Sequence, residues 1–140
     1  MTTYNTIMLS SILPGPVIYE KVASEAFLPG YLVELDSDDK LLKQDDAATV
    51  APLLFVLEDD LRGRGIDDGY SAGDKSRAWQ PLPGDQVYAF LADGQNVAKN
   101  ELLESNADGT LRAYDTGQVI AMADEALSPS GDARILVTIV

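Results

Sequence analysis

Residues 83–111 carry the pattern that most restricts how this chain can fold. Over residues 83–97, and on through 102–105 to 108–111, short apolar stretches alternate with polar positions between glycine-bearing turns. A period of two places alternate side chains on opposite faces of an extended strand, whereas a helical face requires a period of 3.6. The pattern therefore predicts a run of short antiparallel strands, and the fold class that we expect is all-β, a small barrel.

Other segments extend this prediction over the rest of the chain. Residues 17–22 are rich in β-formers, and residues 31–35 and 41–42 flank an acidic turn, as in a hairpin. Residues 51–57 form a short, continuous apolar run that is typical of a buried strand, and residues 133–140 predict a terminal strand. Residues 61–74 contain four glycines and predict a long loop.

A weak internal repeat is also visible. Five residues recur in the same order and spacing: Leu32, Val33, Glu34, Asp38 and Leu41 as Leu102, Leu103, Glu104, Asp108 and Leu111. This recurrence predicts a duplicated β-hairpin.

Composition narrows the classes of function. The chain has 140 residues, of which 46% are hydrophobic, so it can bury a core in one domain. It lacks cysteine and histidine, which argues against disulfides, thiolate chemistry, the usual zinc ligand and the usual general base. A net charge of −13 disfavours nucleic acid as a partner. With no signal peptide or apolar segment of spanning length, we expect a soluble protein that is made in the cytoplasm and does not bind membranes.

Residues 1–16 differ from the rest of the chain. They carry no charged side chain and end in Pro14-Gly15-Pro16, which interrupts any regular element. We interpret them as an extended arm that lies against the body or another subunit, and residues 17–140 as a single β domain; a fraying terminus is the alternative. The arm's candidate interface residues are Tyr4, Ile7, Met8, Leu9, Ile12 and Leu13. We expect deletion of residues 1–13 to leave the body folded but to reduce binding to the particle.

The remaining candidates concern binding more than catalysis. The acidic run at 36–39 lacks the glycine and glutamate of a calcium loop, and the aspartate pairs 45–46, 59–60 and 67–68 consist of neighbours that point apart on a strand. We therefore expect no catalytic, metal or cofactor residues. Arg62 and Arg64 lie in the glycine-rich loop and could bind carboxylates of a partner, and Tyr70 closes this part of the loop. Trp79 is either an interface anchor or a core residue.

One resemblance covers most of the chain after the arm. It is carried by residues 17–23, 29–34, 63–74, 83–85, 93–99 and 104–112. Together these segments resemble the head decoration, or cement, proteins of tailed bacteriophages. The resemblance implies a β-barrel-like or β-tulip domain without an active site. It also implies a homotrimer that sits on the outer surface of the virion head and bridges neighbouring major capsid proteins.

Two other classes remain open. Residues 94–103 also resemble the turn of biotinyl and lipoyl carrier domains, with Lys99 in the place of the modified lysine. Asn100 replaces the glycine of that turn, and the Met-Lys-Met hairpin is absent. The third class is a hydrolase that uses paired aspartates.

Overall fold

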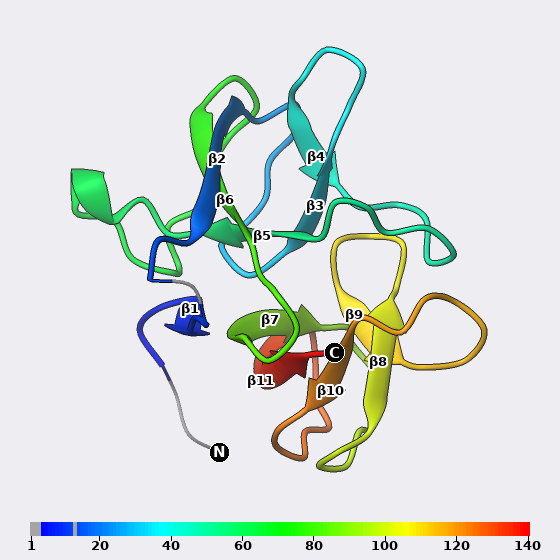
Figure 1. Ribbon diagram of the computed structural model, residues 1–140. Helices are drawn as coiled ribbons and strands as arrows, with labels where there is room; N and C mark the ends of the chain where they lie inside the picture. The colour runs from blue at the N-terminus through cyan, green and yellow to red at the C-terminus, as the bar shows by residue number, and fades with distance from the viewer. Residues whose placement is uncertain (1–3, 13) are drawn as a thin grey trace.

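The computed structural model describes residues 4–12 and 14–140 and confirms the prediction of an all-β fold (Figure 1). The only helical element within these residues is one turn of 3₁₀ helix, η1 (Asp60–Arg62). The strands are β1 (Met8–Ser10), β2 (Val17–Val22), β3 (Leu32–Leu35), β4 (Leu41–Lys43), β5 (Leu54–Leu57), β6 (Lys75–Gln80), β7 (Gln86–Leu91), β8 (Leu102–Ser105), β9 (Leu111–Ala113), β10 (Ala121–Ala123) and β11 (Ala133–Ile139).

The strands form two sheets. The larger has the order β1-β7-β11-β10-β8-β9, and a parallel pairing of Leu91 with Leu111 joins β7 to β9, so that β7–β11 close into a small barrel. The smaller has the order β2-β6-β5-β3-β4. A parallel bridge between Ala23 and Leu41 joins the two ends of this second sheet. We call β2–β6 the N-terminal unit and β7–β11 the C-terminal unit.

The two units repeat the same topology. When the strands of each unit are numbered from its own first strand, both sheets have the order first, fifth, fourth, second, third. In both units a single parallel residue pair also links the end of the first strand to the third strand. The register agrees as well, because the Glu34–Leu42 pair of β3 and β4 recurs as Glu104–Arg112 in β8 and β9. The recurrence noted in the sequence therefore falls on equivalent hairpins, and the duplication extends to all five strands.

Alternation along the strands divides the side chains of the N-terminal unit between two cores. Val33, Val56 and Ala78 belong to a cluster within that unit, whereas their neighbours pack with residues of the C-terminal unit. Those neighbours are Leu32, Phe55, Leu57 and Trp79, and all are buried. Because both faces of β5 are covered, all four of its residues are buried, which confirms the strand predicted from the apolar run.

The N-terminal arm is part of this architecture. Met8 pairs with Val87, so β1 extends the larger sheet beyond β7, and the Tyr88 N–H donates to the Ile7 carbonyl oxygen at 2.9 Å. The Ile7 side chain has no exposed surface and lies in the core shared by the two units. Deleting residues 1–13 would remove this side chain and uncover β7, so the expectation that the body is indifferent to the deletion is wrong.

We expect Ile7→Ala to lower the free energy of unfolding by about 2–5 kcal/mol, because it leaves a cavity in the shared core. Ile12 is 62% exposed, so Ile12→Ala is the matched control and should change that free energy by no more than about 0.5 kcal/mol. Urea unfolding of both variants measures the difference. Equal effects would show that Ile7 does not belong to the core.

Candidate interaction surface

Three of the residues predicted at an interface lie in the core of their own chain. Ile7 and Trp79 are in the shared core. Tyr70 packs against Phe27, and its hydroxyl donates to the Leu57 carbonyl oxygen at 2.8 Å. Burial raises the pKa of Tyr70 to about 12. These side chains therefore support the fold and offer almost no surface to a partner.

The remaining arm residues lie on or near the surface. The Tyr4 ring meets the Tyr88 ring edge to face, with 5.2 Å between centroids. Met8 and Leu9 are half-buried against the shared core, and Ile12 is exposed. Leu13 lies outside the described residues. Of these side chains, Ile12 presents the most surface to another molecule.

The predicted loop begins with η1 and carries the two exposed arginines. Gly63 ends η1 in the left-handed conformation, with φ of 74°. The Arg62 side chain is 63% exposed, and its Nε lies 3.5 Å from the Asp59 carboxylate. Arg64 is exposed as well. The Asp59 side chain is buried, but the Arg62 and Arg64 side chains are exposed, so both guanidinium groups remain accessible to carboxylates of another molecule.

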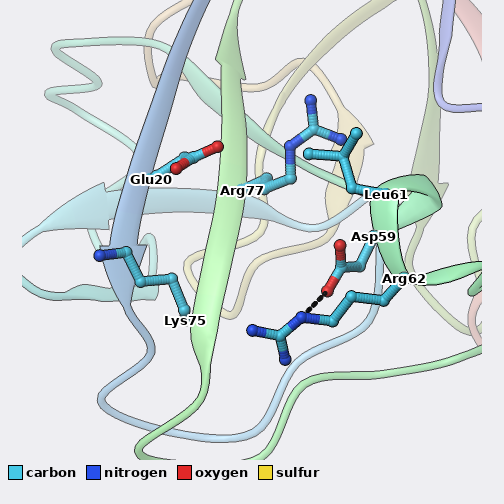
Figure 2. Close-up of a pocket in the computed structure, with 6 residues that line it drawn as sticks. All are labelled: Glu20, Asp59, Leu61, Arg62, Lys75 and Arg77. Atoms are coloured by element: carbon cyan, nitrogen blue, oxygen red, sulfur yellow. Dashed lines mark ion pairs between the residues drawn. The ribbon is translucent and has the colours of Figure 1, made fainter.

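A shallow hollow of about 140 Å³ lies between η1 and the strands β2 and β6 (Figure 2). Its lining residues are Glu20, Asp59, Leu61, Arg62, Lys75 and Arg77. Figure 2 shows Arg77 between Glu20 and Lys75 on one side and the η1 residues on the other. Three of the six lining side chains are basic, although acidic residues outnumber basic ones 23 to 10 in the chain. The hollow is therefore richer in basic groups than the chain as a whole, although Glu20 and Asp59 also line it.

Arg77 connects this hollow to a second one. Its Nη1 donates to the Asp60 carboxylate at 2.7 Å and to the Glu58 carbonyl oxygen at 3.3 Å. Its Nε is buried and has no acceptor among the described residues. On the other side of Arg77, Met8 and Ile18 line a hollow of about 160 Å³. Arg77 thus lies between a mainly charged depression and a more apolar one.

Exposed apolar side chains accompany these hollows. Leu61 is 78% exposed on η1, Ile18 is 37% exposed on β2, and the neighbouring Val17 is also exposed. The sequence prediction identified Arg62 but missed Leu61, Ile18, Lys75 and Arg77. The only local signal was the occurrence of basic residues at alternate positions of β6, and their proximity to η1 depends on the tertiary fold.

The acidic residues do not gather into a site. The aspartate pairs at 59–60 and 67–68 take part in ion pairs with arginines. Across residues 4–12 and 14–140, no group of three or more His, Cys, Asp or Glu side chains is arranged to hold a metal ion. Lys99, which the carrier resemblance singles out, is exposed in the turn between β7 and β8.

Glu104 is the one fully buried glutamate of the repeat hairpins. It accepts hydrogen bonds from the backbone N–H groups of Asp115 and Gly117, at 2.6 and 3.0 Å, and from the Arg112 guanidinium, at 2.6 and 2.9 Å. Burial opposes ionisation, but these donors outweigh it and lower the pKa of Glu104. A Cβ on Gly117 would come within 2.5 Å of the Ala47 carbonyl oxygen, so this loop also packs closely on the N-terminal unit. The role of Glu104 is therefore structural.

No model of a known protein family matches this chain, and no curated protein matches it in sequence. In the part of the chain that the structure describes, no helix has the length and apolar character needed to cross a lipid bilayer.

The buried Glu104 gives a pH-dependent prediction. A lowered pKa in the folded state means that the ionised carboxylate stabilises the fold above its ordinary pKa of about 4.3, and that this stabilisation is lost as the pH falls through the folded value. We expect Glu104→Gln to lower the free energy of unfolding by about 1–3 kcal/mol at neutral pH and by less in acid. Urea unfolding in neutral and acidic buffer checks this, with the exposed Glu20→Gln as control. A deficit that stays constant with pH would contradict it.

Proposed function

We propose that this protein is a structural component of a virion that binds the outer surface of a tailed-phage head and stabilises contacts between major capsid proteins. The observation that best supports the proposal is the surface around η1 and β2. There, the exposed apolar side chains of Val17, Ile18 and Leu61 lie beside a concentration of basic groups in an otherwise acidic chain. Such a combination is typical of a protein-binding surface.

Two further properties fit a decoration role. The units share one core, so the chain is a rigid body able to transmit load between the subunits that it bridges. The net charge of −13 repels nucleic acid, which is compatible with attachment to the outside of a DNA-filled shell. We also propose that the protein self-associates as a homotrimer, since β1 and β2 each leave an edge without a strand neighbour among the described residues.

Binding to heads is the direct test. Purified heads that lack the protein are mixed with it, sedimented, and analysed for the protein in the particle fraction. The proposal predicts saturable co-sedimentation with a fixed copy number per head. Recovery of the protein only in the supernatant at every concentration would contradict it.

Substitutions in η1 should separate apolar from charged contributions to that binding. If docking buries Leu61, Leu61→Ser should weaken binding by about 1.5–3 kcal/mol, because the side chain is 78% exposed in the free protein. Arg62→Ala with Arg64→Ala should cost about 1 kcal/mol or less and act mainly at low salt, since both side chains are exposed.

Co-sedimentation across a salt series measures both effects. Leu102→Ser is the matched control because Leu102 is also exposed but lies on the C-terminal unit, on β8. If Leu102→Ser weakens binding and Leu61→Ser does not, the docking surface lies on the other unit.

Light scattering at low and high protein concentration tests the trimer. We expect a mass three times that of the chain, which is 15.0 kDa. A monomer at both concentrations would contradict assembly in solution before docking.

A further inference from the structure

The repeat allows the two units to be compared residue by residue. Ala23 and Leu91 make the equivalent parallel pairs, so the residues before them are equivalent too, and Val22 corresponds to Phe90. Val22 pairs with Lys75 in β6, and Phe90 pairs with Arg134 in β11. Lys75 and Arg134 therefore occupy equivalent positions. Counting back two residues, Glu20 corresponds to Tyr88.

The equivalent strands differ in how much of them is covered. Of the six residues of β2, none is fully buried, whereas the last five of β7 all are. Part of the difference lies at the outward positions Glu20 and Val22, which are not buried although the equivalent Tyr88 and Phe90 are. We call the outward surface of β2 and β6 the β2–β6 face, defined by Ile18, Glu20, Val22, Lys75 and Arg77.

Segments from outside the C-terminal unit cover the equivalent face of that unit. Tyr4 lies against Tyr88, and Tyr31 packs on Phe90 with 4.7 Å between ring centroids. The guanidinium of Arg134 lies 4.6 Å from the centre of the Phe90 ring. Aromatic side chains of the arm and the N-terminal unit thus cover the apolar part of this face.

Arg134, the basic residue of that face, has three hydrogen-bond acceptors. Arg134 donates to the Pro29 carbonyl oxygen at 3.1 Å, to the Asp67 carboxylate at 2.9 Å, and to the Ile66 carbonyl oxygen. Residues 66–67 belong to the loop of the N-terminal unit. The chain itself therefore shows what such a face binds: a loop segment that brings a carboxylate, a carbonyl and an adjacent apolar residue.

The β2–β6 face has the same kinds of groups but is only partly occupied by the described chain, because Asp60 and the Glu58 carbonyl oxygen accept from Arg77 Nη1 alone. Lys75 is exposed and forms no ion pair within residues 4–12 and 14–140, and the Arg77 Nε lacks an acceptor there. Both side chains line the hollow of Figure 2, and Ile18 lines the neighbouring one. An incoming acceptor reaches the exposed Lys75 directly, and a small shift of the Arg77 side chain would also give its buried, costly Nε–H an acceptor.

We propose that the β2–β6 face binds an extended, acidic segment of a partner protein, which places a carboxylate near Lys75 and Arg77 and an apolar side chain against Ile18. The inference rests on the proposed function only in taking the partner to be another protein. A two-fold dimer through this face would place Lys75 and Arg77 of one copy near the same basic residues of the other, so charge favours a partner segment over a second copy. The chain's own arm is not available, because β1 already pairs with β7.

A peptide copied from the internal occupant tests the face directly. The probe is acetyl-Gly-Ile-Asp-Asp-Gly-Tyr-amide, the sequence of residues 65–70, and its matched control has asparagine for both aspartates. In an NMR titration of the full chain, the acidic probe should saturably shift the Ile18 methyl, Lys75 side-chain and Arg77 Nε–H signals. The asparagine peptide should bind about tenfold more weakly, as expected for loss of a charge-assisted contact to a partly buried group.

Variants locate the contact. Lys75→Gln, which changes an exposed side chain, should weaken the acidic probe about threefold. Lys99→Gln removes the same charge from an exposed site in the C-terminal unit and should leave binding unchanged. Equal binding of the two peptides, shifts confined to other residues, or no shift at 10 mM probe (roughly the weakest binding that the method follows) would overturn the proposal.

The outcomes also separate this inference from the proposed function. If heads bind the protein, but the probe shifts no signal of the β2–β6 face and Lys75→Gln does not weaken probe binding, the inference fails and the proposed function stands. If the probe binds this face but heads do not bind the protein, the function fails and the inference stands. If the Ile18 and Lys75 signals shift on concentration alone while sedimentation shows a dimer, the occupant is a second copy, and the proposed partner segment is overturned.

Discussion

The outer face of the N-terminal unit packs on the C-terminal unit, and the two units thereby share one hydrophobic core. Leu32, Phe55, Leu57 and Trp79 each lie one residue from a side chain that points into their own unit, so the same strands serve two cores. A unit of about 60 residues buries too little surface to be very stable alone. The shared core increases the apolar surface that each unit buries. It also holds the arm against the body, because the Ile7 side chain is buried in the same core.

The shared core makes the two copies of the repeat unequal. The arm and the loops of the N-terminal unit cover β7, whereas β2, at the equivalent position, stays exposed. Duplicated units that stack head to tail always leave one face of the first unit uncovered, unless a ring closes. In this chain the uncovered face carries Lys75 and Arg77 beside the exposed Leu61 of η1. The exposure of this face, on which the proposed binding depends, therefore follows from the asymmetry of the stack.

Basic residues are few and most have definite partners. Arg112 neutralises the buried Glu104, and Arg134 joins the two units through Asp67 and the Pro29 carbonyl oxygen. Arg77 meets Asp60 but keeps a buried Nε without an acceptor among the described residues. In a chain with 23 acidic and 10 basic residues, basic groups that are not fully paired attract partners of opposite charge most strongly.

Features that depend on neighbouring residues could be predicted without the structure: the all-β class, the strand at β5, the hairpins around 36–40 and 106–110, and the loop that begins at η1. Alternation and turn residues act over a few positions, so they can be recognised locally. Tertiary structure decided that Ile7 and Trp79 belong to the core, that the hairpin repeat extends to five strands, and that Lys75 and Arg77 lie beside η1. These features come from contacts between segments far apart in the chain, and a strand's local pattern does not specify what covers its outer face.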